Sequence, residues 1–384
     1  MANSNLSSAK RAKNDEFYTQ YGDIQKEIEA YLEYDPAVFS GKVVYCNCDD
    51  PFESNFFRYF VLNFNKLGLK QLITTSYKPS PVANTQLELY GDDKTLPVSK
   101  GRPKINANKF IINDVHDMDG DGEFNLKDVA QQLKENQHNE WTPLEGDGDF
   151  RSDECVELLK QSDIVVTNPP FSLFRVYVRQ LVDYDKQFVI IGNMNAITYK
   201  EIFPLIKNNQ LWLGNGFHAG NAYFYTPNTR DFASGVFDAA TGLVKFRNVC
   251  WFTNLDHGRR HQPLPLMTMG DNLKFSKHKE IRGKEGYDRY DNYDAIEVPF
   301  TDAIPCDYDG AMGVPISFLD KYCPEQFEIL GITDRDNNSG LKIREYTEED
   351  AANFGDLNRR GAIKIGHEYK STYARLLIRR KSAK

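Results

Sequence analysis

Short apolar runs alternate with amphipathic segments through the first two thirds of the chain. The apolar runs that predict strands are 42–48, 69–77, 163–167, 187–193, 210–214 and 248–254. Segments between them carry apolar residues at helical spacing, as in 24–32, 56–60 and 173–184. This alternation predicts an α/β fold with a mostly parallel sheet flanked by helices.

The run 163–167 is followed by Asn168, Pro169, Pro170 and Phe171. The two prolines remove backbone donors, so the strand has to end there. Asn168 precedes a proline and is therefore biased toward an extended conformation. Its side chain and the nearby carbonyls would project from the carboxyl end of a strand, where open α/β sheets bind ligands.

This corner suits a planar group with an exocyclic NH2, such as a nucleobase. The Asn168 side chain and the carbonyl groups accept hydrogen bonds, and the Phe171 ring offers a stacking face. The alternative is an ordinary turn in which Asn168 caps the following helix.

The first predicted strand leads into Asp49, Asp50 and Pro51 and then into a helix beginning near Phe56. This order is typical of the first strand-turn-helix unit of a nucleotide-binding sheet. The turn contains no glycine, so it lacks the G-x-G-x-x-G cradle of a dinucleotide site. The missing cradle disfavours a nucleotide-dependent oxidoreductase.

Charge is distributed unevenly over the 384 residues, whose formal net charge is −8. Residues 359–384 contain nine Lys or Arg and one acid, and 245–289 contain ten basic and five acidic residues. A solvated basic face would explain either cluster alone. Together they predict that the C-terminal third contacts phosphates.

The remaining composition bounds the location of the protein. No stretch approaches the ~18 apolar residues of a membrane span, and residues 1–13 form a polar, basic arm that we expect to be disordered rather than a secretory signal. Six scattered cysteines suit a reducing compartment. We therefore expect a cytoplasmic protein without a membrane partner, whose oligomeric state the sequence leaves open.

Residues 117–128 match the template of a calcium-binding loop, with a glycine at loop position 6. The predicted structural Ca²⁺ ligands are Asp117, Asp119, Asp121 and Asp128. The alternative is a loop that folds without metal through Asx-type turns.

Three motifs together resemble the EcoRI-type adenine-specific DNA methyltransferases. They are the segments 14–19 (Asn-Asp-Glu-Phe-Tyr-Thr), 48–52 (Cys-Asp-Asp-Pro-Phe) and 163–174, which contains Asn-Pro-Pro-Phe. The resemblance runs along most of the chain. It implies a Rossmann-like class I methyltransferase sheet that binds S-adenosylmethionine, with a catalytic domain at 14–256 and a DNA target-recognition region at 257–384.

The resemblance also implies roles for individual residues. The catalytic residues would be Asn168, Pro169, Pro170 and Phe171. The cofactor-binding residues would be Phe17, Tyr18, Thr19, Asp49, Asp50, Pro51, Asp149 and Phe150. The aromatic segment at 17–19 could equally be part of the core, and 145–151 could equally be a glycine-rich turn with solvated acids.

The expected reaction is direct transfer of a methyl group from S-adenosylmethionine to the 6-amino group of an adenine flipped out of double-stranded DNA. Basic residues on predicted loops of the C-terminal region suit phosphates and base edges; they are Arg259, Arg260, Arg282 and Lys284. A cognate restriction endonuclease is an expected genetic neighbour. The alternatives are methylation of cytosine, of guanine in RNA or of protein glutamine, and a non-catalytic DNA-binding protein on the same fold.

Overall fold

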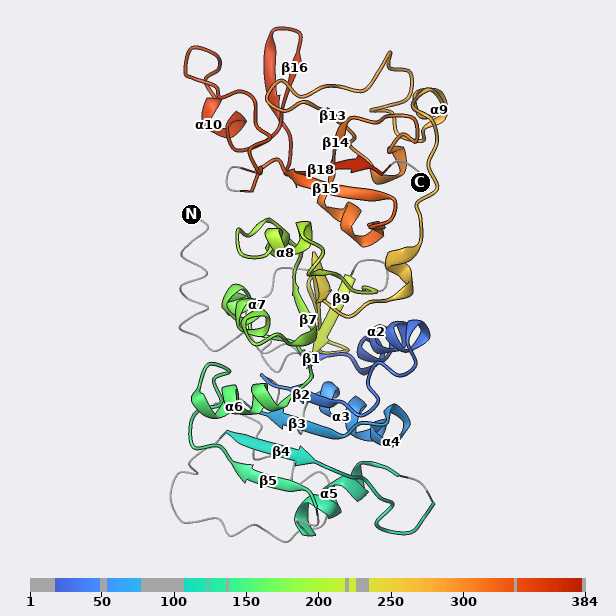
Figure 1. The fold of residues 1–384 in the computed structure, drawn as a ribbon, viewed down its shortest axis with the longest axis vertical. Coiled ribbons are helices and arrows are strands. Elements are labelled where there is room, and N and C mark those ends of the chain that lie inside the picture. Colours follow the sequence, from blue (N-terminus) through green and yellow to red (C-terminus); the bar gives the residue numbers. More distant parts are fainter. Residues whose placement is uncertain are drawn as a thin grey trace. The chain divides into compact units, whose positions relative to one another are not determined.

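The computed structural model describes residues 18–48, 54–76, 107–122, 124–135, 138–217, 221–225, 235–334 and 337–381 (Figure 1). They form two compact units, one from 1–194 and 214–256 and the other from 195–213 and 257–384. The predicted catalytic domain includes 195–213, which the structure places in the second unit. There the Asn337 side chain donates to the Thr198 carbonyl at 2.9 Å, and Lys207 donates to Ser339 at 2.9 Å.

The main sheet of the first unit has the strand order β5-β4-β3-β2-β6-β7-β12. Its strands are β2 (Val43–Cys46), β3 (Gln71–Thr75), β4 (Asn108–Ile112), β5 (Glu140–Pro143), β6 (Ile164–Thr167), β7 (Gln187–Asn193) and β12 (Val249–Thr253). The central strands β3, β2, β6 and β7 pair in parallel, whereas β4, β5 and β12 are antiparallel to their neighbours. The expected parallel sheet is thus confirmed at its centre and is mixed toward its edges.

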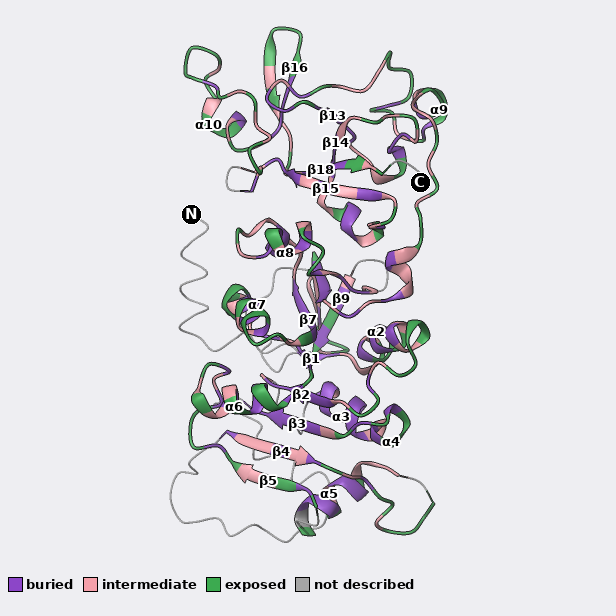
Figure 2. Cartoon of the chain, viewed as in Figure 1, coloured by how far each residue is buried: buried purple, intermediate pink, exposed green. Residues whose placement is uncertain are grey.

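Helices of the first unit cover this sheet. They are α2 (Tyr21–Tyr34), α3 (Asn55–Leu62), α4 (Phe64–Leu67), α5 (Leu126–Glu135), α6 (Asp153–Gln161) and α7 (Phe174–Asp183). Apolar residues of α2, α3, α4 and α5 share one core with β2 and β6. Both strands are buried along their whole length, as Figure 2 shows for β2. A strand buried on both faces needs apolar residues at every position, which explains the continuous apolar runs that predicted these strands.

A second, smaller sheet joins the N-terminal strand to a later part of the first unit. Its order is β1-β9-β11-β10. The strands are β1 (Tyr18–Thr19), β9 (Asn221–Tyr225), β10 (Phe237–Asp238) and β11 (Leu243–Arg247). Because β1 pairs with β9, the chain entering α2 has a defined position beside the main fold.

The second unit contains a four-stranded sheet of order β13-β14-β18-β15 and a two-stranded hairpin, β16-β17. The sheet strands are β13 (Ala295–Glu297), β14 (Ala311–Pro315), β15 (Phe327–Ile332) and β18 (Arg375–Arg380), and the hairpin is Ala362–Ile365 with Glu368–Ser371. The other helices and strands of the second unit are α8 (Phe203–Lys207), β8 (Trp212–Leu213), α9 (Met269–Phe275) and α10 (Phe354–Leu357). In the described parts of both units, 3-10 helices cover Phe171–Leu173, Met194–Thr198, Gly258–His261, Thr301–Ala303 and Ile316–Lys321. The hairpin lies beside α10 (Figure 1).

Candidate active site

The chain order places the carboxyl ends of β2 and β6 at a point where the sheet reverses direction. From β2 the chain moves outward to β3, and it later returns to β6 on the other side of β2. Such a reversal opens a crevice at the carboxyl edge. Asn47 follows β2 and Asn168 follows β6, so both side chains lie at this edge.

Asn168 occupies the corner that the sequence predicted. Strand β6 ends at Thr167, and a 3-10 helix covers Phe171–Leu173 before α7 begins. Neither helix receives a hydrogen bond from a capping side chain. The alternative in which Asn168 caps the next helix is therefore wrong.

The residues beside Asn168 make this corner compact. Pro169 is buried, whereas Asn168 and Pro170 are half-buried. Phe171 is also half-buried and packs against the core of the first unit. The corner therefore combines an amide, proline carbonyls and an aromatic ring on rigid backbone.

A buried polar network joins the β6 corner to the turn after β2. The Thr167 hydroxyl donates to the Asn47 carbonyl, and the Tyr177 hydroxyl of α7 donates to the Asn47 side-chain oxygen. Asn47 is buried between them. The predicted cofactor residues Asp49, Asp50 and Pro51 lie outside the described residues.

The N-terminal segment reaches the same turn. Asn55 begins α3, and its side-chain amide donates to the Thr19 carbonyl at 2.8 Å. Tyr18 and Thr19 are both buried, and Phe17 lies outside the described residues. The Thr19 hydroxyl has no hydrogen-bond partner among the residues that the structure describes.

The loop 145–151 approaches the end of β3. Gly148 has φ +78°, and a Cβ atom there would lie 2.0 Å from the Ser76 carbonyl oxygen, so only glycine fits. Asp149 accepts hydrogen bonds from the Arg151 guanidinium at 2.9 and 2.6 Å. Phe150 is buried and packs edge-to-face on Tyr177, with 4.9 Å between ring centroids.

Arg151 sets the charge state of Asp149. Its hydrogen bonds lower the pKa of the Asp149 carboxyl, against a smaller opposing effect of burial. Asp149 is therefore a carboxylate at neutral pH, able to accept hydrogen bonds.

The comparison with known families decides the identity. The family model described as adenine-specific methyltransferase EcoRI matches residues 5–381. The chain belongs to this family.

Individual relatives agree with the assignment. The chain is 42% identical over 338 residues to the Type II methyltransferase M.EcoRI of Escherichia coli, covering 86% of this chain and 91% of the relative. It is 35% identical over 329 residues to the Type II methyltransferase M.MpnI of Mycoplasma pneumoniae, covering 84% and 83%. No solved structure gives a significant match. The protein is an adenine-specific DNA methyltransferase, and membership of the EcoRI family implies S-adenosylmethionine as methyl donor.

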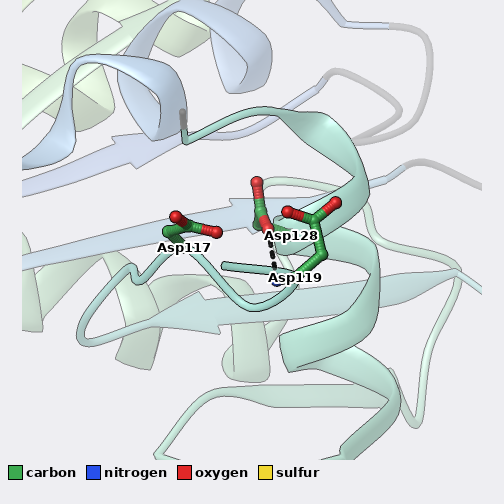
Figure 3. A group of neighbouring side chains, drawn as sticks. All are labelled: Asp117, Asp119 and Asp128. Carbon is green, nitrogen blue, oxygen red and sulfur yellow. Dashed lines mark hydrogen bonds between the residues drawn. The ribbon is translucent and has the colours of Figure 1, made fainter. Parts of the chain in front are cut away.

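The predicted calcium loop of this family member folds around its own carboxylates. Asp117, Asp119 and Asp128 point toward one another, with one oxygen of each within 4.8 Å of the others (Figure 3). These carboxylates accept backbone N–H bonds: Asp117 from Gly120 and Gly122 at 2.7 Å each, Asp119 from Asp121 at 3.2 Å, and Asp128 from Met118 and Asn125 at 2.8 Å each. Backbone donors close the loop as Asx-type turns do, and no finding supports calcium.

The predicted DNA-binding residues of the second unit differ in their surroundings. Arg260 is only 6% exposed, and its guanidinium lies 3.8 Å from the Trp212 ring centroid, which favours a packing role over a DNA contact. Arg259 is half-buried, whereas Arg282 and Lys284 are exposed. Lys284 pairs with Asp288 at 2.7 Å.

Two buried polar residues were missed by the sequence analysis. Asn47 directly follows the apolar run 43–46, and a polar residue in that place is the signal that could have found it. Glu27 lies on the apolar face of α2 and is fully buried. Its carboxylate accepts from Tyr31 at 2.7 Å and from the backbone of Asn215 and Gly216 at 2.9 and 3.0 Å. Only the fold reveals the partners Asn215 and Gly216, because they lie far away in sequence.

Proposed function

We propose that the Asn168 corner binds an adenine flipped out of a specific duplex DNA site and presents its 6-amino group for methylation. The Asn168 side-chain oxygen and the Pro169 carbonyl would accept the two N–H bonds of the amine. The adenine lone pair is delocalised into the ring, and acceptors on both N–H bonds favour a pyramidal nitrogen whose lone pair points out of the plane. Phe171 would stack on the base.

The single observation that carries this proposal is the position of the corner. It lies at the carboxyl edge where the sheet reverses, and neither following helix takes a side-chain cap there. A double-proline corner cannot donate backbone N–H bonds from Pro169 or Pro170, so it is suited to a donor group on the ligand.

The cofactor would lie against the neighbouring turn. When bound, S-adenosylmethionine supplies an electrophilic methyl group. The buried Thr19 hydroxyl supports a polar ligand beside this turn, because such a group is costly to bury without a partner. The Asp149 carboxylate is an acceptor for an amino group, and we assign it with Phe150 to the adenine end of the cofactor.

The other predicted cofactor residues complete this assignment. Phe17, Tyr18 and Thr19 would cover the methionine end, and Asp49, Asp50 and Pro51 would form the turn beneath it, with carboxylates facing the ammonium group. Because the Asn55 amide binds the Thr19 carbonyl, the N-terminal segment and the start of α3 would move as one piece.

We assign the catalytic role to the first unit and target recognition to the region 257–384. The C-terminal region carries the excess of basic residues, and the first unit contains the Asn168 corner. No helix within the described ranges combines the length and apolar character of a membrane span. We propose a cytoplasmic location, with which the six free cysteines agree. We also propose a cognate restriction endonuclease as a genetic neighbour.

The test is transfer of a labelled methyl group to duplex DNA, followed by digestion and identification of the modified nucleoside and its neighbours. We expect N6-methyladenine in a single sequence context. Label in cytosine, or label that spreads over many contexts, would contradict the proposal.

A further inference from the structure

The segment 274–284 is a basic stretch of the described second unit that also exposes an aromatic ring. It contains Lys274, Lys277, Lys279, Arg282 and Lys284 against a single acid, Glu280. Phe275, the last residue of α9, is 62% exposed. Burying this ring against a partner would remove its apolar surface from water.

A backbone hydrogen bond brings the two ends of this segment together. After α9 the chain turns back, and the Gly283 N–H donates to the Leu273 carbonyl at 2.8 Å. Lys274 and Phe275 follow Leu273, and Arg282 and Lys284 flank Gly283, so all four lie close together. The Lys274 ammonium is 4.9 Å from the centroid of the Phe275 ring.

The side of the segment that faces the fold is held firmly. Ile281 is buried. The His278 ring stacks on Phe300 with 3.6 Å between centroids, and His278 and Lys277 both bind Asp302, at 2.8 and 2.7 Å. These contacts fix the backbone, so the outward side chains sit on a stable platform rather than on a loose loop.

The cations of this segment differ in their pairing. Lys277 pairs with Asp302 and Lys284 with Asp288. Among the described residues, Lys274, Lys279 and Arg282 have no acidic partner within salt-bridge distance, and the side chains of Lys279 and Arg282 are exposed. Three cations without an acidic partner, one of them beside an exposed ring, match a polyanion that also offers flat apolar faces.

We propose that Lys274, Phe275, Lys279 and Arg282 form a duplex-DNA contact surface, called here the α9 surface, in which the cations bind phosphates and the Phe275 ring enters the groove and packs on the bases. This inference rests on the proposed function and names the surface through which the second unit meets DNA. Acidic residues argue against the hairpin β16-β17 as the main DNA contact. Glu368 lies on the hairpin. The loop that begins at Tyr346, whose ring contacts Tyr369 of the hairpin, adds Glu348, Glu349 and Asp350.

The first experiment measures DNA binding of the triple variant Lys274→Gln, Lys279→Gln, Arg282→Gln at several salt concentrations. The matched control is Lys26→Gln, Lys66→Gln, Lys70→Gln, which removes three exposed positive charges from the first unit. Each lost phosphate contact lowers the slope of log K against log salt by about 0.9. We expect the α9 triple to weaken DNA binding at least about tenfold and to lose about two to three units of slope, and the control to change neither.

The second experiment removes the ring by Phe275→Ala, with Tyr184→Ala as control. Tyr184 is an exposed aromatic of the first unit, 37% exposed, with the Lys160 ammonium 6.0 Å from its ring centroid. We expect Phe275→Ala to weaken DNA binding about tenfold without changing the salt slope. Phe275→Tyr should restore the affinity, and Tyr184→Ala should behave like the unaltered protein.

Calorimetric titration of S-adenosylmethionine and thermal unfolding of every variant separate a binding effect from a folding effect. If the unaltered protein methylates adenine in DNA and the α9 variants bind DNA like their controls, the inference is overturned while the proposed function stands. If the unaltered protein transfers no methyl group to adenine, the proposed function itself fails. If the α9 variants lose both DNA binding and thermal stability while the controls lose neither, these residues serve folding, and the inference is also overturned.

Discussion

Asn168 takes its chemistry from the residues on either side of it. The buried strand β6 places it at the sheet edge, and the following prolines supply carbonyl groups without N–H donors. Thr167, just before it, is bonded to the Asn47 carbonyl, which holds the end of the strand in place. At this scale a single amide has a defined direction because both flanking segments are rigid.

Replacing Asn168 by Ala should lower methyl transfer roughly 10²–10³-fold or more, because an acceptor aimed at the reacting amine is lost. Binding of S-adenosylmethionine should stay close to that of the unaltered protein. Labelled methyl transfer and calorimetry measure the two. Parallel loss of both would mean that the substitution damages the fold, and the assigned role would be abandoned.

Replacing Phe171 by Ala should weaken the complex with the extruded base by about 1–3 kcal/mol, the usual contribution of one stacked aromatic ring. Phe171→Trp and Phe171→Tyr keep a flat ring and should retain activity. Fluorescence of 2-aminopurine at the target position reports extrusion. Equal extrusion by the Ala and Trp variants would rule out stacking on Phe171.

At the scale of elements, α7 connects the Asn168 corner to the sheet. Its first residue, Phe174, lies over β7, where a Cβ on Gly192 would come within 2.4 Å of the ring. One turn later, Tyr177 reaches Asn47 at the end of β2. The glycine allows close packing of helix on sheet, and the tyrosine fixes the rotation of the helix.

Gly192→Ala should therefore destabilise the protein by about 1–3 kcal/mol, because the ring and helix must shift to admit the methyl group. Methyl transfer should fall as well, since α7 follows directly from the corner. Urea unfolding measures the stability. Gly22→Ala is the control, because nothing lies within 4 Å of its Cβ position; it should be neutral or stabilising, and a similar loss there would refute the steric explanation.

The loop 117–128 should be sensitive to acid rather than to chelators. Burial alone would raise the pKa of Asp128, but backbone N–H bonds from Asn125, Met118 and Asp119 outweigh it and lower the pKa. A lowered folded-state pKa contributes stability that is complete above the unfolded value of about 3.9 and is lost as pH falls below it.

The hydrogen-exchange protection of this loop, corrected for the intrinsic exchange rate at each pH, should therefore fall below about pH 4. The midpoint of thermal unfolding should be the same with and without a calcium chelator. A lower midpoint in chelator, restored by added calcium, would instead support the metal site of Asp117, Asp119, Asp121 and Asp128.

At the scale of the whole molecule, the chain divides into two compact units. The second unit depends on an ion pair inside its sheet. Arg375 of β18 binds Glu297 of β13 at 2.7 Å, and Tyr290 also donates to that carboxylate. Both charged side chains are almost fully removed from solvent.

Arg375→Ala should lower the free energy of unfolding of the second unit by about 3–5 kcal/mol, since it leaves a buried carboxylate without its cation. Arg379→Ala is the matched control on the same strand. Arg379 pairs with Glu328 at the surface, so its loss should cost about 1 kcal/mol or less. Denaturant unfolding compares them, and equal effects of the two variants would contradict the argument.

Local pattern was enough to predict much of this architecture. The run 187–193 is β7 residue for residue, and 163–167 ends at the prolines as expected, because burial on both faces and the lack of an N–H leave few other conformations. The antiparallel direction of β4 and β5 was not predicted, since a strand's own residues do not encode the direction of its neighbour. The burial of Arg260 against Trp212 was missed for the same reason, because the partner is supplied by a distant segment.

The amino-acid sequence by itself determined where the strands β2, β3, β6, β7 and β12 lie, where the Asn168 corner falls and to which family the chain belongs, since these follow from local sterics, apolar periodicity and motif identity. Only the tertiary structure decided that Asn47 and Tyr177 join the two turns of the site, that 195–213 belongs with the C-terminal unit and that Phe275 stands exposed among cations. The physical reason is that a contact between distant segments depends on how the whole chain packs in three dimensions. The local sequence of either segment does not identify its partner.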